Sequence, residues 1–503
     1  MPSRREVLLH GAIGAGFIAS NVSGVTALAA AAPPLRRSLK GLAWNDPIVA
    51  TYRDAVGMMK NRPAGDKFNW VVLSQIHGYD PDNFHYCPHG DWYFLPWHRA
   101  YTAMYERIVR KLTGNTGFAM PYWDWTADPL MPAVFLNPTL PNGKPNWLCV
   151  TDSGWTRTWP PSKPMPPEIV GPAVLKKILA AKGYENFGTS RNPSQHDTNP
   201  SWVPAGGGAQ GVLESTPHNN VHNNIGGWMP SASSPRDPIF FMHHANIDRI
   251  WALWNTTNTN SPDPLWTNMQ FTKNFVNPDG TAWSPKVSDL YVPETLGYTY
   301  GLKRALRLPG PQFQALTTKL NTLFAIPAGA ASPAVQTVSV ANTATALPGR
   351  PLEVAIAVPP AALAAVRRRP PPPRPGNLTV MESLTEAEGS AAGTRALAFL
   401  RDVAITEPKT TMFRIFIDAP NVSEDTPTTD PHYVGTFGVL SHGGHDGHGK
   451  LPSFVVDLTE AIQKVGGGAD GKITLQLVPV TNEANGTRGT ATPSRIEVSF
   501  IAN

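Results

Sequence analysis

Apolar residues recur at helical spacing in five stretches of the N-terminal three-fifths of the chain. In one of them Val174, Leu175, Ile178 and Leu179 fall three or four positions apart, which places them on one face of a helix. Stretches dense in Pro, Gly, Asn and Ser, at 126–170 and 186–211, predict loops. The predicted helices cover Pro47–Met59, Asp66–His77, Arg99–Leu112, Ala173–Lys182 and Ile239–Asn255.

The pattern changes after about residue 325, where Ala, Pro, Val and Thr dominate and Trp disappears. Short β-branched runs between turn residues predict an antiparallel β-domain. Pro370–Pro373, flanked by Arg367–Arg369 and Arg374, predicts an exposed polyproline-like linker that proteases can reach. The runs are Leu352–Val358, Phe413–Asp418, Ile473–Val480 and Ile496–Ile501.

Composition narrows the class of protein. The chain has 503 residues, enough for two to four domains, and 41% hydrophobic residues, which excludes bulk disorder. Its net charge of +5 is mild, and no basic stripe interleaved with aromatics points to nucleic acid. With Cys87 and Cys149 as the only cysteines, a disulfide scaffold and a multi-thiolate metal site are excluded, whereas one disulfide remains possible.

The first 32 residues have the pattern of a targeting segment. Arg4 and Arg5 precede a weakly apolar, Gly/Ala-rich stretch, and Ala27-Leu28-Ala29 offers a small-x-small cleavage site. The pattern resembles a twin-arginine export signal, which carries folded proteins through the twin-arginine machinery to the periplasm or the medium. An ordinary signal peptide or a membrane anchor are the alternatives. No run of 18 apolar residues follows this segment, so the sequence predicts no stable membrane association.

Eight of the 14 histidines fall into two clusters in the N-terminal region. His218 and His222 are four residues apart, so on a helix both rings lie on one face and can reach one metal. Asp248 stands four residues after His244, where its carboxylate can orient a ligand or its helix from the second shell. A site made of imidazoles alone, with no group of carboxylates or thiolates beside them, suits copper, zinc, iron or nickel. The H-E-x-x-H pattern of zinc hydrolases is absent from the sequence. The clusters are His77, His85, His89, His98 and His218, His222, His243, His244.

These histidines, with the strings Phe94–Arg99, Pro121–Trp125 and Asp237–Trp251, resemble the type-3 copper proteins, which comprise tyrosinases and other polyphenol oxidases, catechol oxidases and hemocyanins. The resemblance covers roughly 45–300. It implies a mainly α catalytic domain in which a four-helix bundle with long loops holds two copper ions, with O2 as co-substrate. Carried over by motif, the first copper is held by His77, His89 and His98, and the second by His218, His222 and His244.

The resemblance also implies roles for the neighbours of these histidines. In the paired-His motif the second residue is the ligand, so His243 would pack or hydrogen-bond nearby, and His85 would be a loop residue. Cys87 would form a thioether with His89; a Cys87–Cys149 disulfide is the competing interpretation. Phe94 and Phe240 each precede a ligand by four residues and would pack on its ring, and Ser231, thirteen residues before His244, would leave the entrance open.

The reaction implied is ortho-hydroxylation of monophenols such as tyrosine, followed by oxidation of the o-diphenols to o-quinones. Glu214 and Asn219 match a family pair that polarises a water to take the phenol proton. A helix-start carboxylate and a turn residue are their alternative roles. A catechol oxidase without hydroxylation, or an O2 carrier of hemocyanin type, are the alternative functions.

The C-terminal part, with Met412–Asp418 and Tyr433–Phe437, resembles the β-domain of plant polyphenol oxidases, which covers the copper site and keeps the enzyme latent. A permanent stabilising domain is the alternative. His442, His445 and His448, with Asp446, lie in a Gly-rich stretch that we expect to be a solvated loop; capture of copper is the alternative. The expected divisions are a signal at 1–32, a catalytic domain at 33–325, a linker with the first strands at 326–395 and a sandwich-like antiparallel β-domain at 396–503.

Overall fold

The longest helix, α3 (Phe94–Thr113), forms the centre of the N-terminal region and packs against α8 (Ile239–Trp254) and α1 (Pro47–Lys60). It begins five residues before the predicted start, because a proline in the first helical turn, here Pro96, interrupts no helical hydrogen bond. It ends at Gly114, whose positive φ of 72° suits a residue without a side chain. Every residue of α3 from Phe94 to Glu106 is buried, which places His98 in the protein interior.

The computed structural model describes residues 32–80, 83–84, 86–192, 206–273, 275–302, 319–320, 323–324, 335–368, 393–440, 450–468, 470–481 and 487–502. The export signal, His85, the Pro370–Pro373 linker and the stretch with His442, His445 and His448 lie outside these residues. None of the described helices is both long enough and apolar enough to span a membrane.

Shorter elements surround α3 and α8. The predicted helix at Asp66–His77 is wrong in extent: α2 covers only Trp70–Ser74, because the Asn69 side chain caps its start by accepting from Val71 N, and residues 75–77 form a turn. The other short helices are α4 (Pro167–Val170), α5 (Pro172–Ala180), α6 (Tyr184–Phe187), α7 (Asn219–Ile225) and α9 (Pro264–Thr267). A π-helical turn at Glu214–His218, 3-10 turns at Ala133–Phe135, Ser234–Arg236, Val287–Leu290 and Pro293–Leu296, and the hairpins β1–β2 (Gly78–Asp80, Asn83–Phe84) and β4–β5 (Phe275–Val276, Ala282–Trp283) complete this region.

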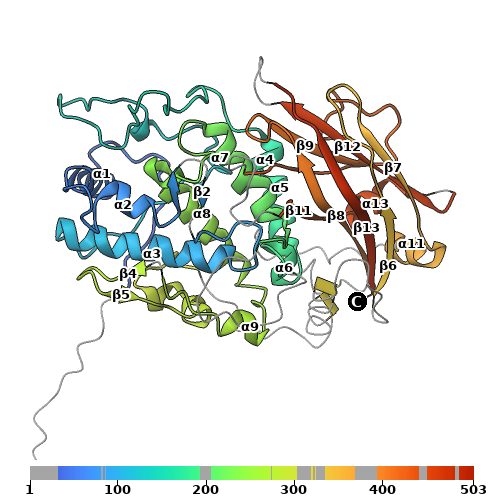
Figure 1. Ribbon diagram of the computed structural model, residues 1–503, viewed down its shortest axis with the longest axis horizontal. Coiled ribbons are helices and arrows are strands. Elements are labelled where there is room, and N and C mark those ends of the chain that lie inside the picture. Colours follow the sequence, from blue (N-terminus) through green and yellow to red (C-terminus); the bar gives the residue numbers. More distant parts are fainter. Residues whose placement is uncertain are drawn as a thin grey trace, which may run out of the picture. The chain divides into compact units, whose positions relative to one another are not determined.

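The C-terminal region contains two sheets, in agreement with the predicted division into a helical part and a β-part (Figure 1). Along β7 every second residue is buried, as expected for a strand with one face on a core. Ile356 and Leu475 of one sheet and Leu400 and Val498 of the other belong to a single hydrophobic cluster, so the sheets share one core. The four-stranded sheet has the order β10 (Tyr433–Phe437), β9 (Thr411–Ile417), β12 (Lys472–Thr481), β7 (Leu352–Ala357), and the five-stranded sheet has the order β3 (Ala209–Gln210), β11 (Ser453–Asp457), β8 (Thr394–Ile405), β13 (Ala491–Ala502), β6 (Gln336–Ala341). Helices α11 (Pro360–Arg367) and α13 (Thr459–Val465) pack beside them.

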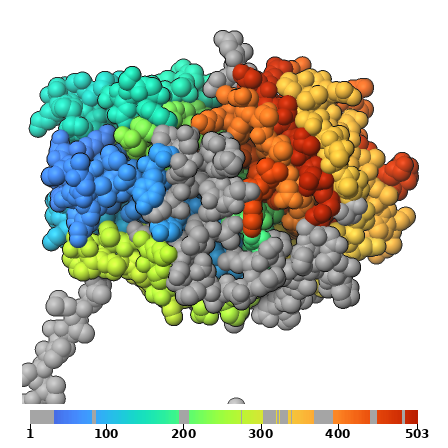
Figure 2. Space-filling model, in the orientation of Figure 1, coloured from blue at the N-terminus to red at the C-terminus, as the bar shows by residue number. Residues whose placement is uncertain are grey.

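The two regions are joined by more than the chain between them. Strand β3 belongs to the N-terminal region, within a stretch predicted to be a loop, yet it pairs in parallel with β11. Arg414 of β9 forms a bidentate ion pair with Glu168 of α4, with N–O distances of 2.7 and 2.8 Å. Helices α4 and α5 accordingly lie next to the C-terminal strands in Figure 1, and Figure 2 shows the two surfaces meeting. Pro34–Asn503 is therefore one compact unit.

Candidate metal centre

Four buried side chains form the first group of potential metal ligands. His77 follows α2, Cys87 and His89 lie in the loop before α3, and His98 is on the first turns of α3. One donor atom of each lies within 4.8 Å of the others. The ring centroids of the three histidines are 5.3 to 5.8 Å apart. Residues separated by 21 positions in the sequence thus converge on one point.

The second group contains four imidazoles, His218, His222, His243 and His244, which are also within 4.8 Å of one another. His218 ends the π-helical turn, His222 lies one turn further along α7, and the pair His243 and His244 lies on α8. Nε2 of His222 is 3.2 Å from Nε2 of His244. The two groups adjoin, because the ring of His98 stacks on that of His244 at 4.3 Å and His89 is 5.4 Å from His218.

Backbone carbonyls fix the tautomer of three of these imidazoles. Nδ1 of His77 donates to Ala232 O at 2.6 Å, Nδ1 of His98 to Phe94 O at 2.8 Å, and Nδ1 of His222 to Met229 O at 2.7 Å. A carbonyl oxygen only accepts, so Nδ1 carries the proton and the Nε2 lone pair is available to a metal.

Burial keeps the imidazoles neutral. It lowers the pKa of His77 to about 3 and that of His222 to about 4, and holds the pKa values of His98, His218 and His244 well below the usual range. Neutral rings are the form that binds metal. Nε2 of His218 is buried and has no hydrogen-bond partner among the described residues, so a metal ion would satisfy it. The donor set fits two copper ions.

Sequence comparison decides between the metals that such a site suits. Residues 67–257 match the family model for the common central domain of tyrosinase, and residues 380–493 match the model for the C-terminal domain of chloroplastic polyphenol oxidase. The tyrosinase of Streptomyces lincolnensis is 32% identical over 192 residues, which are 35% of this chain and 67% of that protein. The chain belongs to the tyrosinase family. Copper is the metal that this family implies.

Two further relatives describe the extent of the likeness. Tyrosinase HcTyr1 of Hahella sp. (strain CCB-MM4) is 29% identical over 306 residues, which cover 51% of this chain but only 61% of that protein. The structure of latent aurone synthase, a polyphenol oxidase, superposes with a TM-score of 0.60 over 94% of this chain and 90% of the other, at 19% identity. At this identity the superposition shows a shared fold, which includes both the helical core and the C-terminal sheet region.

Around the tyrosinase-family site, His243 differs from its neighbours in its partner. The indole N–H of Trp125 donates to its Nδ1 at 3.3 Å. The Nδ1 lone pair of His243 is therefore used, whereas Nδ1 of the adjacent His244 has no partner among the described residues. Both rings lie close enough to the other imidazoles to belong to the second group. The preference for His244 as the ligand therefore remains a prediction from the family motif.

The thiol of Cys87 lies against His89. Its Sγ is 3.8 Å from Nδ1 and 3.7 Å from Nε2 of that ring. The same Sγ is 3.2 Å from Nε2 of His98. Both cysteines are free thiols, and Cys149 donates to Leu136 O, so the alternative Cys87–Cys149 disulfide is not formed.

The aromatic residues chosen from the sequence lie on the imidazoles. The Phe94 ring is 4.8 Å from His98 and 4.6 Å from His218, so it separates the two groups at one side. The Phe240 ring is 4.1 Å from His244. Ser231 is buried and its hydroxyl donates to Trp228 O, so it provides a small side chain inside the fold.

Glu214 and Asn219 flank His218 but have different partners. The buried Glu214 carboxylate accepts from Gly90 N at 2.8 Å and from the Thr189 hydroxyl. Burial raises the pKa of Glu214 to about 8, although these two hydrogen bonds oppose the rise. The Asn219 side chain accepts from Nδ1 of His218 at 2.9 Å. Glu214 thus has the proton affinity of a base that works near neutral pH.

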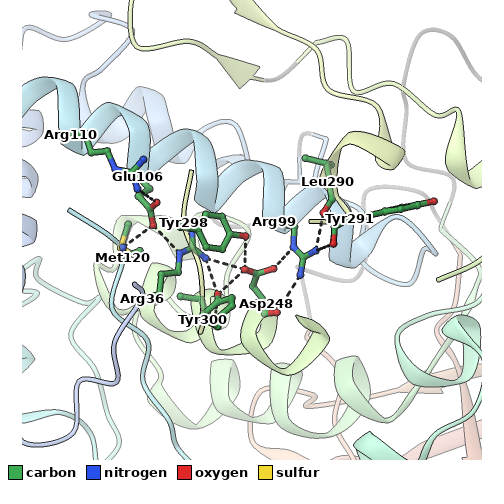
Figure 3. Close-up of polar contacts among 11 residues, drawn as sticks. Arg36, Arg99, Glu106, Arg110, Met120, Asp248, Leu290, Tyr291, Tyr298 and Tyr300 are labelled. Atoms are coloured by element: carbon green, nitrogen blue, oxygen red, sulfur yellow. Dashed lines mark hydrogen bonds and ion pairs between the residues drawn. The ribbon is translucent and has the colours of Figure 1, made fainter. Parts of the chain in front are cut away.

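Asp248 supports the helix and not an imidazole. Its carboxylate accepts from Arg36 Nη1 at 3.0 Å, from Arg99 Nε, and from the hydroxyls of Tyr298 and Tyr300, both at 2.7 Å (Figure 3). Of the two roles that the sequence suggested for Asp248, orienting a ligand or its helix, the contacts support the second, because they hold α8, which carries His244. Sequence reasoning missed Arg36, Tyr298 and Tyr300, since nothing in local spacing indicates that they meet Asp248.

Proposed function

We propose that this chain catalyses the copper-dependent oxidation of phenols by O2, hydroxylating monophenols to o-diphenols and oxidising these to o-quinones. The observation that carries the proposal is the pair of adjoining imidazole groups, with ring centroids of His98 and His244 4.3 Å apart. His77, His89 and His98 would hold one copper and His218, His222 and His244 the other, within the four-helix bundle that the family resemblance implies. When bound, the copper pair activates O2 and takes electrons from the phenol.

The residues of this chain have separate tasks in that reaction. The imidazoles of His77, His98 and His222, fixed by carbonyls at Nδ1, present Nε2 in a constant orientation. The rings of Phe94 and Phe240 keep the ligands in place and exclude water. A phenol must lose a proton whose pKa is near 10, and we assign the role of its acceptor to Glu214, whose pKa burial raises to about 8. Ser231 leaves room for the substrate ring.

A catechol oxidase without hydroxylation is the second candidate, and one observation favours it. Both amide protons of Asn219 are donated to protein acceptors, to Gln210 Oε1 at 2.8 Å and to Gly438 O at 2.9 Å. In this arrangement the amide has no proton left for a water that it would share with Glu214.

Three measurements on the purified chain test the proposal. Elemental analysis is expected to give two copper ions per chain. Addition of a monophenol and, separately, of a catechol is expected to produce coloured quinone with oxygen uptake. Colour from catechol alone would establish the second candidate. Zinc in place of copper, or no oxidation of either substrate after limited proteolysis that opens a latent enzyme, would contradict both.

The remaining family features extend the proposal. We propose a thioether in which a bond from Cys87 Sγ to a ring carbon of His89 replaces the S–H bond and one ring C–H bond, and O2, the oxidant of the proposed reaction, takes the two hydrogen atoms. The thioether is expected to lower the intact mass by two hydrogen atoms and to leave Cys87 unreactive to thiol reagents after unfolding. We also propose that residues 1–32 are a twin-arginine signal, that 33–325 form the catalytic domain, and that the β-domain at 396–503, joined through 326–395, shields the site. Small phenols are the substrates, and the signal places the enzyme in the periplasm or outside the cell.

Replacing Glu214 with Gln is expected to lower monophenol hydroxylation about a hundredfold, while catechol oxidation changes little, because only the monophenol needs a base.

The same change is expected to alter the pH dependence of the free energy of unfolding. Between the usual carboxyl pKa of 4.5 and the folded value of about 8, the unfolded chain releases a proton that the folded chain retains. Stability of the parent therefore falls as pH rises through this interval, and Gln removes the fall.

Denaturant titrations of metal-free parent and Glu214→Gln at pH 5, 6.5 and 8 measure this second effect. The advantage of the variant is expected to grow with pH. Parallel pH profiles for the two proteins would show that Glu214 is ionised in the fold throughout this range and would contradict its raised pKa.

A further inference from the structure

The side chain of Asn219 is held at all of its polar positions. It is 1% exposed. Its oxygen accepts from Nδ1 of His218, and its nitrogen donates to Gln210 Oε1 and to the carbonyl of Gly438, with distances of 2.8 to 2.9 Å for the three bonds. An amide so enclosed cannot rotate without losing hydrogen bonds that are buried from water.

The contact with Gly438 fixes the direction of this chain of hydrogen bonds. A backbone carbonyl only accepts, so the group of Asn219 that faces it must be the NH2. The Asn219 oxygen must then face His218, and because that oxygen also only accepts, the proton of His218 must be on Nδ1. Nε2 of His218, which is buried without a partner among the described residues, is left as the metal-binding atom.

One partner of the Asn219 nitrogen lies in the C-terminal region, and the other lies on the N-terminal strand β3, which pairs with β11 of that region. Gly438 follows directly on β10 of the four-stranded sheet, and Gln210 is on β3 of the five-stranded sheet. The placement of Gly438 is itself secured, because its N–H donates to Ser215 O at 2.7 Å and the Thr216 hydroxyl donates to Thr436 O at 2.7 Å. Ser215 and Thr216 lie in the π-helical turn that ends at His218.

We propose that Gly438 and Gln210 are positioning residues for the second metal: through Asn219 they set the tautomer of His218, so the C-terminal domain is a structural part of the metal centre as well as its cover. The inference rests on the proposed function, since His218 is taken as a copper ligand. It extends that function, because in this arrangement loosening the β-domain weakens copper binding at the second site.

A pair of glycine variants, one on β10 and one directly after it, tests the proposal in the full-length chain. A Cβ at Gly438 would lie 2.3 Å from Oδ1 of the buried Asn220, so Gly438→Ala must displace this segment. A Cβ at Gly435 would meet nothing within 4 Å, so Gly435→Ala is the matched control. Metal-free proteins are titrated with Cu(II), and bound copper and unfolding temperature are measured.

Gly438→Ala is expected to bind the second equivalent of copper about tenfold to a hundredfold more weakly than the parent, as typical for loss of a residue that orients a ligand. Gly435→Ala is expected to match the parent. Equal copper binding by both variants overturns the inference. A parent that binds no copper instead overturns the proposed function, so the two failures are distinguishable.

A double-mutant cycle separates orientation of the amide from general disturbance of the fold. Asn219→Asp presents two oxygens, so the carboxylate accepts from His218 Nδ1 in either orientation and Gly438 no longer decides the tautomer. Asn219→Asp is expected to retain both coppers, and Gly438→Ala in this background is expected to cost no further affinity. The same loss with Asp as with Asn at position 219 would mean that Gly438 acts only through packing, which contradicts the proposal.

Gln210→Leu provides an independent variant if Gly438→Ala folds poorly. It removes the second acceptor of the Asn219 nitrogen without touching β10. It is expected to weaken the second copper as well, with an unchanged first equivalent. Full retention of both equivalents would contradict the role of Gln210.

Discussion

Replacing His222 with Ala is expected to remove the second copper and to lower phenol oxidation about a thousandfold or more. The side chain is fully buried, its Nδ1 is fixed by Met229 O, and its Nε2 faces Nε2 of His244 at 3.2 Å, so the variant loses a donor atom that is already oriented toward the second site. A metal that contributes several kcal/mol to the transition state accounts for a factor of this size, since about 1.4 kcal/mol corresponds to tenfold. Copper content and the rate of quinone formation measure the effect.

His432→Ala is the matched control. His432 lies in the β-domain, where Asp430 Oδ1 is 2.8 Å from its Nδ1, and it belongs to neither histidine group. This variant is expected to keep two coppers and the activity of the parent. Loss of less than about tenfold in His222→Ala, with copper retained, would contradict the assignment of the second site.

The adjacent histidines on α8 test the finer assignment. His244→Ala is expected to behave like His222→Ala. His243→Ala is expected to keep the copper, because Trp125 already donates to Nδ1 of His243 and the family motif selects the second residue of the pair. The reverse order of the two variants would show that the motif misleads in this chain.

The residues of the metal centre could be predicted because their chemistry is carried by rare side chains at fixed spacings. His218 and His222 are four residues apart, so spacing alone puts them on one side of a helix, whereas His98 was joined to its group by the family motif. The atoms that orient the rings could not be predicted in this way. Ala232 and Met229 act through backbone carbonyls, which every residue has, and only the folded chain shows which ones meet an imidazole.

The fold was predictable to the same degree. Apolar periodicity located α1, α5 and α8 and the strands β7, β9, β12 and β13 within a few residues. It did not locate β3, a two-residue strand whose existence depends on β11 about 240 positions later in the sequence. It placed the start of α2 too early, because the capping side chain of Asn69, and not apolar spacing, decides where that helix begins.

Loss of the Asp248 carboxylate is expected to destabilise the fold by about 3 to 5 kcal/mol, the range for removing one partner of a buried ion pair. Burial alone would raise the pKa of Asp248, but the charges of Arg99 and Arg36 and the hydroxyls of Tyr298 and Tyr300 outweigh it and hold the pKa below its usual value. The stabilisation is therefore complete above the unfolded pKa of 3.8 and is lost as pH falls further. Asp248→Asn, which keeps the shape, tests the charge by denaturant titration at neutral pH.

Glu460→Gln is the control for an ion pair without this enclosure. Lys464 Nζ lies 2.8 Å from Glu460, one helical turn away, but the Glu460 side chain is 61% exposed, so its loss is expected to cost no more than about 0.5 kcal/mol. Similar losses in the two variants would mean that the enclosure of Asp248 adds nothing.

The contacts of Asp248 also determine which segments lose stability first when the carboxylate is replaced. Arg36 lies 212 residues before Asp248, and Tyr298 and Tyr300 lie 50 and 52 residues after it, so one carboxylate connects both ends of the helical region to α8. Arg36 further donates to Glu106 on α3 at 2.8 Å, and its guanidinium lies 3.4 Å from the centre of the Tyr298 ring. In Asp248→Asn, hydrogen exchange is therefore expected to rise first at residues 34–39 and 298–300 and only later around His244. Exchange that rose uniformly along the chain would show that the network stabilises the fold as a whole, without holding these two segments in place.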